Sequence, residues 1–312
     1  MPEQLLIQLK DVVKKFNKNL VLSGVNLTIN NKDIYGIIGT SGSGKTTILN
    51  LIIGFLKTNG GSITYDSKNI SVIQDKIHQT FGFASQGGSY YNKLSVEENI
   101  AFFGKMYNLS SSEIKEKTNE ILGLVELNDA RNKLASELST GMQRRLDIAC
   151  ALIHSPRVLI LDEPTEDLDP ILRKEVLALI RRINAQKDTT IIITSHLLGE
   201  IELVCNKIAI LNNGRIISDG SPDQLKEGYS SNYEISLQTK NEDYAKITKY
   251  LNKHGYKKIF DKKHRIIIYT EKPEITMKSM LSFLKAKKEK IIELSLNKPS
   301  LEEVFEAVTK QH

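Results

Sequence analysis

The sequence predicts an α/β fold with a mixed sheet at its core, followed by a smaller α+β unit. Three observations predict it. The apolar run 34–38 passes through a glycine-rich loop at 39–47 into a helical pattern at 48–55. A second apolar run, 158–161, has the composition of a buried parallel strand and ends in two carboxylates. After residue 220 the order of strand and helix patterns changes, which indicates a second domain.

Composition limits the classes of function. The 312 residues include 43 Lys and Arg against 37 Asp and Glu, and the basic excess lies mostly after residue 220. No long basic run appears, so we expect no nucleic-acid partner. Cys150 and Cys205 lack the paired spacing of a disulfide framework or a zinc site. The N-terminus lacks a signal-peptide pattern, and no apolar run approaches the roughly 20 residues of a membrane span.

The first elements are predicted to be strands. Residues 5–13 and 20–29 alternate apolar and polar side chains around a turn at 17–19, which is typical of an antiparallel pair. Residues 60–65 continue the β-rich character. Phe16 lies at the turn, where its ring either packs against neighbours or offers a platform on which a base stacks.

The loop at 39–47 reads Gly-Thr-Ser-Gly-Ser-Gly-Lys-Thr-Thr. A strand that turns through glycines into a helix points several N–H groups at one spot, where the helix dipole also favours an anion. Glycines let a phosphate approach the main chain, a lysine supplies a cation, and a threonine hydroxyl can ligate Mg²⁺. We therefore predict a nucleoside triphosphate site formed by Gly39, Thr40, Ser41, Gly42, Ser43, Gly44, Lys45, Thr46 and Thr47.

A helical block follows a short strand at 81–84 that leads to Gln86. Residues 95–154 are mostly helical by periodicity, with Ser95 as the predicted cap of one helix and 110–112 as the start of another that runs through 122. Residues 138–142, Leu-Ser-Thr-Gly-Met, precede a further helix at 143–153. That N-terminus is either an ordinary cap or a second anion site.

Two carboxylates, Asp162 and Glu163, end the apolar strand at 158–161. Open α/β sheets hold their ligands at this end of their strands. One carboxylate can hold Mg²⁺, directly or through water, and its neighbour can orient or deprotonate an attacking water. A helix at 170–182 and a strand at 189–194 should follow. His196, just after that strand, is either incidental or part of the same site.

Taken together, these motifs resemble the ATP-binding subunits of ABC transporters over residues 5 to about 220. The resemblance implies a P-loop NTPase cassette at 1–220 with an antiparallel β subdomain and a helical signature subdomain at about 87–157. It also implies residue roles: Phe16 stacks on adenine, 39–47 is the Walker A loop, Gln86 is the Q-loop glutamine that touches Mg²⁺ and faces the membrane partner, 138–142 is the signature, Asp162 is the Walker B aspartate, Glu163 is the catalytic base, Asp169 is the D-loop aspartate, and His196 is the switch histidine at the γ-phosphate.

The resemblance further implies a head-to-tail pair of cassettes, identical or different. Ser139 and Gly141 of one copy would cap the ATP held by Lys45 of the other. Each γ-phosphate would add charge-assisted hydrogen bonds across the interface, and hydrolysis would remove them. The implied cofactors are ATP and Mg²⁺, the implied partner is a transmembrane permease, and the implied location is the cytoplasmic face of the cell membrane. We expect the permease to dock beside Gln86, where Tyr90 and Tyr91 offer exposed aromatic anchors.

Two departures from the family pattern stand out. The signature has Thr140 and Met142 where Gly and Gln are commonest, and Thr resists a positive φ. Asp167 replaces a usual glycine and adds a negative charge near the expected dimer seam. Because Ser139, Gly141, Lys45 and the two carboxylates are kept, we still expect hydrolysis.

Residues 221–312 are predicted to form an accessory domain. The periodicity gives a strand at 233–238, a helix at 242–254, strands at 256–260 and 265–270, a helix at 275–286 and a strand at 291–296. This βαββαβ order is that of a ferredoxin-like unit. Ser300 and Glu303 predict the cap of a final helix. The ending 299–305 resembles the tail of subunits that serve exporters of drugs, lipids or polysaccharides, and its apolar face packs on its own domain or on a second subunit.

Other classes of function can be weighed from the sequence. The Asn-Lys-x-Asp motif by which GTPases select guanine is missing, which favours ATP. An ABC-type ATPase acting on ribosomes or DNA remains an alternative, although two cassettes in one chain or a long coiled-coil insertion would be typical of it. A regulatory cassette in a heterodimer is the other alternative, since Thr140 and Met142 alter the signature.

Overall fold

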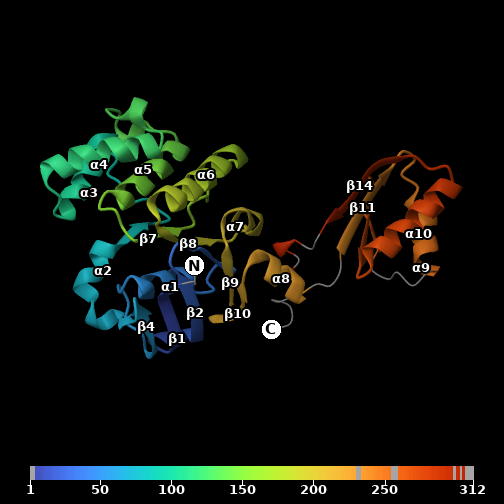
Figure 1. Cartoon of the computed structure of the whole chain (residues 1–312), viewed down its shortest axis with the longest axis horizontal. Helices are drawn as coiled ribbons and strands as arrows, with labels where there is room; N and C mark the ends of the chain where they lie inside the picture. The colour runs from blue at the N-terminus through green and yellow to red at the C-terminus, as the bar shows by residue number, and fades with distance from the viewer. Residues whose placement is uncertain (1–3, 230–232, 254–258, 298–299, 303, 306–312) are drawn as a thin grey trace. The chain divides into compact units, whose positions relative to one another are not determined.

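The structure is a computed structural model that describes residues 4–229, 233–253, 259–297, 300–302 and 304–305. The chain forms two compact units, residues 1–222 and 223–312 (Figure 1). Among the described residues, no helix has both the length and the apolar character needed to cross a bilayer.

A six-stranded sheet forms the centre of the first unit. Its five parallel strands are flanked at one edge by an antiparallel strand, β10. Every residue of β3, β7 and β8 is buried, as expected for parallel strands with both faces covered. In order across the sheet the strands are β10 (Arg215–Gly220), β9 (Lys207–Asn212), β3 (Ile34–Ile38), β8 (Thr190–Ser195), β7 (Val158–Asp162) and β6 (Phe81–Ala84).

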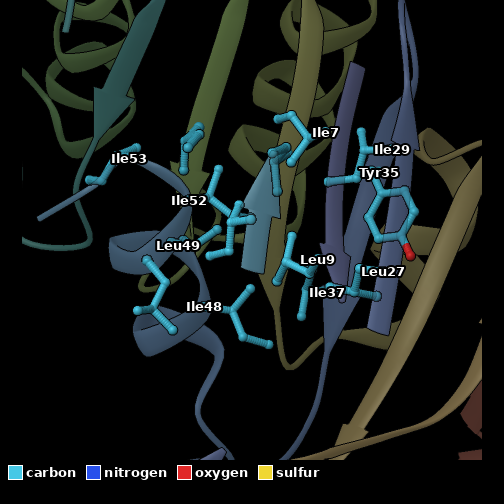
Figure 2. Close-up of a cluster of buried hydrophobic side chains, with 14 of the residues drawn as sticks. Ile7, Leu9, Leu27, Ile29, Tyr35, Ile37, Ile48, Leu49, Ile52 and Ile53 are labelled. Atoms are coloured by element: carbon cyan, nitrogen blue, oxygen red, sulfur yellow. The ribbon is translucent and has the colours of Figure 1, made fainter. Parts of the chain in front are cut away.

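An antiparallel sheet packs with the helix that follows β3. Its strand order is β2-β1-β4-β5, with β1 at Leu5–Phe16, β2 at Asn19–Asn30, β4 at Gly60–Tyr65 and β5 at Lys68–Asn69. Figure 2 shows Ile48, Leu49 and Ile52 of helix α1 (Lys45–Ile52) meeting side chains of β1, β2 and β3 in one buried cluster. This cluster anchors the helix whose N-terminus lies at the glycine-rich loop.

The helices between β6 and β7 form a group of their own, at the upper left of Figure 1. Helices α3 and α4 both begin with a capping box, formed by Ser95 with Glu98 and by Ser110 with Glu113. The α-helices of the first unit after α1 are α2 (Gln74–Thr80), α3 (Val96–Met106), α4 (Ser111–Leu124), α5 (Thr140–Leu152), α6 (Pro170–Lys187) and α7 (Leu198–Val204), and α8 (Pro222–Tyr229) begins at the last residue of this unit.

The second unit has the predicted ferredoxin-like order. Its antiparallel sheet runs β12-β13-β11-β14, and the buried core lies between that sheet and two helices. The elements are β11 (Tyr233–Thr239), α9 (Tyr244–Lys253), β12 (Ile259–Asp261), β13 (Ile266–Thr270), α10 (Pro273–Ala286) and β14 (Ile291–Asn297). Residues 256–258 of the predicted strand 256–260, and Glu303 of the predicted final cap, lie outside the described residues.

Some predicted boundaries are wrong, and each has a local cause. The helix predicted at 48–55 ends at Ile52, because Gly54 takes a φ of 77° and its N–H bonds to Leu51 O at 3.2 Å. The helix predicted to end at 182 continues to Lys187, where Asp188 in the left-handed region ends it. Strands β5, β9 and β10 and helices α2, α7 and α8 were not predicted, since their short segments carry no strong periodicity.

Candidate functional site

One cavity lies where the glycine-rich loop meets the carboxyl ends of the central strands. Its volume is about 530 Å³. The residues that line it come from β2, from the loop and the start of α1, from the segment after β6, from the turn after β7 and from the residue after β8: Val21, Ser41, Gly42, Gly44, Lys45, Thr46, Thr47, Gln86, Glu163, Glu166 and His196. The fold thus brings most of the predicted triphosphate site together with the predicted base, the Q-loop glutamine and the switch histidine.

The loop takes a shape that its glycines permit. Gly42 and Gly44 have φ values of 76° and 110°, in the region that disfavours side chains. At Gly39 a Cβ atom would lie 2.4 Å from the Leu211 carbonyl oxygen. Gly44 immediately precedes α1, so the free N–H groups of the helix N-terminus face the loop.

The Glu163 carboxylate is shared between a cation and a histidine. Lys45 Nζ lies 3.2 Å from Glu163 Oε1, and His196 Nδ1 lies 2.9 Å from Oε2. The Lys45 and Glu163 side chains are only 9% and 10% exposed, so solvent screens this ion pair weakly. Glu163 itself has a φ of 49°, an unfavourable conformation for a glutamate that neighbouring contacts must hold.

Asp162 is held by two hydroxyl groups. Thr46 Oγ1 donates to Oδ2 at 3.0 Å, and Thr194 Oγ1 donates to Oδ1 at 2.5 Å. Thr194 Oγ1 also accepts the N–H of Glu163 at 3.0 Å, because β7 and β8 pair in parallel with Asp162 opposite Thr194. This one side chain therefore positions both acidic residues.

The donor set suits Mg²⁺. The Thr46 hydroxyl, the Asp162 carboxylate and the Gln86 amide offer hard oxygen atoms, which this ion prefers. In the described part of the chain, no group of three or more His, Cys, Asp or Glu side chains could cage a metal. The three donors fit an ion that takes its other ligands from phosphate and water.

The segment that carries Gln86 is tied to helix α5. Arg144 donates to the carbonyl oxygens of Ser85 at 3.1 Å and of Gln86 at 3.2 Å. Asp147 Oδ1 accepts the Ser89 N–H at 2.7 Å. Burial of Asp147 raises the pKa of its carboxyl to about 6, against the lowering effects of the Ser89 hydrogen bonds and of Arg144. The segment that carries Gln86 and helix α5 are therefore joined by polar contacts, of which the Asp147 side chain is the buried member.

The signature residues lie in a different cavity. Ser139 and Gly141 line a hollow of about 340 Å³ together with Asp129, Lys133 and other residues of the helical group. Ser139 caps α5 and Thr140 is its first residue, with no positive φ, so the replaced glycine causes no backbone strain here. Asp167 does take a φ of 61°, which explains why glycine is usual at that position.

Four further predicted residues can be placed. Phe16 is 43% exposed, with Lys14 Nζ 4.9 Å from its ring centre, and it does not line the 530 Å³ cavity. Asp169 caps helix α6 by accepting the N–H groups of its second and third residues. Of the two expected aromatic anchors, Tyr91 is exposed, but the prediction for Tyr90 is wrong, because its ring is half-buried against Gly88.

Sequence reasoning missed four residues of this region. Thr194 could have been found because it carries a hydroxyl group near the end of a strand that lies beside the strand ending in Asp162. Glu166 could have been found because it is a third acidic residue, three positions after Glu163. Arg144 and Asp147 lie one helical turn apart on α5, but their partners, 58 or 59 residues away in the chain, are visible only in the fold.

Two protein families match parts of this chain. Residues 22–166 match the family described as ABC transporter, and residues 220–309 match the family described as ATP-binding protein DrrA1-3-like, C-terminal domain. The chain is 28% identical to the linearmycin resistance ATP-binding protein LnrL of Bacillus subtilis, covering 96% of this chain and 97% of that protein. It is 31% identical to the bacitracin transport ATP-binding protein BcrA of Bacillus licheniformis, covering 80% and 81% of the two chains.

Longer relatives and solved structures extend the comparison. The chain spans 33% of ABC transporter G family member 23 of Dictyostelium discoideum, at 37% identity. Among solved structures, cbiO1 of Clostridium perfringens, part of the ABC transporter complex cbiONQ, matches with a TM-score of 0.68 and 26% identity, over 81% of this chain and 98% of that one.

Proposed function

This chain belongs to the ABC transporter family as an ATP-binding subunit, and from that premise we propose that it hydrolyses Mg-ATP as one of two cassettes that drive a separate transmembrane exporter. The family carries ATPase activity coupled to transport. The single observation that supports our residue assignment is the cavity in which Lys45, Glu163 and His196 meet beside the Thr46 and Asp162 pair.

Each side chain has a role that follows from its position. Lys45 leaves Glu163 for the outer phosphates of ATP, which compete for the same ammonium group. Glu163 is then free to take a proton from the attacking water, and His196 orients it and contacts the γ-phosphate. Thr46, Asp162 and Gln86 would hold Mg²⁺, which supplies charge stabilisation at the phosphate oxygens. The helix N-terminus and the loop N–H groups bind the remaining phosphate charge.

The dimer is proposed because the site is divided between two surfaces. Ser139 and Gly141 line a cavity separate from that of Lys45, so within one copy they cannot cap its nucleotide. A second cassette packed head to tail would bring its own Ser139 hydroxyl and helix N-terminus to the γ-phosphate. Bound ATP would then hold the two copies together, and hydrolysis would release them.

The docking surface for the permease is proposed on the helical group. The Tyr91 ring lies 4.9 Å from that of Phe102 and 6.4 Å from that of Phe103, and Met106 on the same helix is 62% exposed. Aromatic residues and Met are enriched at protein interfaces. A charged substitution at Tyr91 should abolish co-purification of the permease without loss of ATP binding. Unchanged co-purification would show that the permease does not dock on this surface.

Export is proposed from the relatives. The names of two of them refer to linearmycin resistance and to bacitracin transport. Together with the C-terminal match, they favour export over import for this chain. The subunit would work peripherally at the cytoplasmic face of the membrane.

The dimer is tested with Glu163→Gln, which keeps the shape of the side chain but removes the base. With Mg-ATP, sedimentation velocity should show a dimer for this variant and a monomer for Lys45→Ala. A Glu163→Gln protein that binds ATP yet stays monomeric would contradict the two-cassette proposal. If neither the unaltered chain nor Glu163→Gln released phosphate, the chain would be a regulatory cassette rather than the catalytic one.

A further inference from the structure

Glu166 is an acidic side chain of the nucleotide cavity with no role in the account above. It lies in the turn between β7 and α6 and lines the cavity together with Lys45 and Gln86. Its carboxylate accepts a hydrogen bond from Gln86 Nε2. Its backbone N–H donates to Glu163 O at 3.2 Å, so the turn holds Glu166 close to the predicted base.

This pairing fixes which way the Gln86 amide faces. A carboxylate only accepts hydrogen bonds, so the amide must turn its NH₂ group toward Glu166 and its carbonyl oxygen away from it. The backbone of Gln86 is held independently, because Arg144 donates to its carbonyl oxygen at 3.2 Å. With the main chain and the amide nitrogen both held, Oε1 is the atom left to act as a ligand.

We propose that Glu166 is a positioning residue for the cation: it holds the Gln86 amide so that Oε1, with the Thr46 hydroxyl, is presented to the Mg²⁺ of the bound nucleotide. This inference rests on the proposed function, since it requires a Mg-ATP site in the cavity. Partners that orient a metal ligand contribute substantially to metal binding, and their loss costs about 10- to 100-fold in metal affinity. The negative charge of Glu166 acts in the same direction, because it attracts the cation.

The same charge opposes the nucleotide by itself. A carboxylate in the cavity repels triphosphate unless a cation lies between them. Glu166 should therefore couple the two ligands: it favours nucleotide with metal and disfavours nucleotide without metal. A side chain that only stabilised the turn would affect both forms equally, so this coupling distinguishes positioning from a structural role.

The test measures the affinity of the full-length chain for AMP-PNP, a triphosphate analogue that is not hydrolysed, by titration calorimetry. Each protein is titrated with excess Mg²⁺ and again with EDTA, and the ratio of the two affinities gives the coupling. Glu166→Ala should reduce this ratio about 10-fold, with the affinity in EDTA unchanged or higher. Glu166→Gln can still accept a hydrogen bond from Gln86 but lacks the charge. Its affinity ratio should lie between those of the unaltered chain and Glu166→Ala.

Two further variants complete the design. Glu116→Gln removes an exposed carboxylate of α4 outside the cavity and should leave the ratio unchanged. Gln86→Ala should lower the ratio, and adding Glu166→Ala to it should lower the ratio little further, because both act through one amide.

The outcomes separate this inference from the function on which it rests. If the unaltered chain bound AMP-PNP with Mg²⁺ but Glu166→Ala kept the same ratio, the inference would be wrong and the proposed function would stand. A higher ratio in Glu166→Ala would mean that Glu166 withholds Gln86 from the cation, and it would also overturn the inference. Failure of the unaltered chain to bind Mg-AMP-PNP would overturn the proposed function itself.

Discussion

Thr194 is the buried side chain on which the geometry of both acidic residues depends. Its hydroxyl donates to Asp162 at 2.5 Å and accepts the Glu163 N–H at 3.0 Å, and the residue is fully buried. Thr194→Val keeps the shape of the side chain and removes only these two hydrogen bonds. The variant therefore leaves a buried carboxylate oxygen and a buried N–H group without this partner.

The cost can be worked from these two groups. An unsatisfied buried donor or acceptor costs about 1 to 3 kcal/mol, so the loss of both hydrogen bonds should lower the free energy of unfolding by roughly 2 to 6 kcal/mol. For a unit of about 200 residues, each kcal/mol corresponds to about 2 to 4 °C in Tm. A loss near 3 kcal/mol predicts a Tm lower by about 6 to 12 °C. Glu163, at a φ of 49°, would also lose a contact that holds its conformation.

The assay is calorimetric unfolding of the full chain, with Thr194→Ser as the matched variant. Serine keeps the hydroxyl and loses a methyl group, which costs about 1 kcal/mol. The reasoning predicts that Thr194→Val unfolds at a clearly lower temperature than Thr194→Ser and binds Mg-AMP-PNP more weakly. Equal Tm values for the two variants would refute the assignment of two indispensable hydrogen bonds to Thr194.

Three further predictions concern stability. Burial raises the pKa of Asp147 from 3.8 to about 6, so the folded chain holds an extra proton between these values and loses stability as pH rises through them. Asp147→Asn has no carboxyl to titrate, so the free energy of unfolding of this variant relative to that of the unaltered chain should rise between pH 4 and pH 7, by up to about 3 kcal/mol. Urea titrations at several pH values measure this difference, and a difference that stays constant with pH would contradict burial as the cause. Ser95→Ala removes one half of a capping box and should lower the free energy of unfolding by about 1 kcal/mol in the same urea titrations. An unchanged midpoint of unfolding would contradict this prediction. Gly82→Ala would place a Cβ 2.2 Å from the Ala151 carbonyl oxygen and should lower the free energy of unfolding by at least about 2 kcal/mol. The control Gly199→Ala has open space around its new Cβ and should leave that free energy unchanged. Equal values for the two variants would show that strand β6 shifts to accept the methyl group.

Much of the fold and site could be predicted because their signals are local in the sequence. The strand, glycine loop and helix around Lys45 are contiguous, and Asp162 and Glu163 end a run of buried residues. The ferredoxin-like order after residue 220 follows from simple periodicity and is confirmed. Each of these features depends on residues within one or two elements.

The rest could not be predicted, because it depends on contacts between distant residues. Gln86 and Glu166 are 80 positions apart, and only the neighbouring ends of β6 and β7 bring their segments together. Arg144 reaches the Q-loop from a helix that the sequence identified for its N-terminal signature alone. Helix α1 ends earlier than predicted because of the conformation of Gly54, which the pattern of apolar residues does not indicate.

The central claim is that ATP is hydrolysed in the cavity where Lys45 meets Glu163. The most direct measurement is phosphate release by the purified full-length chain with Mg-ATP, together with ATP binding by the same protein. The account predicts release by the unaltered chain, and a fall of at least about 100-fold in Glu163→Gln with ATP binding retained. A Glu163→Gln protein that releases phosphate at the unaltered rate, or an unaltered chain that binds no ATP, would contradict it.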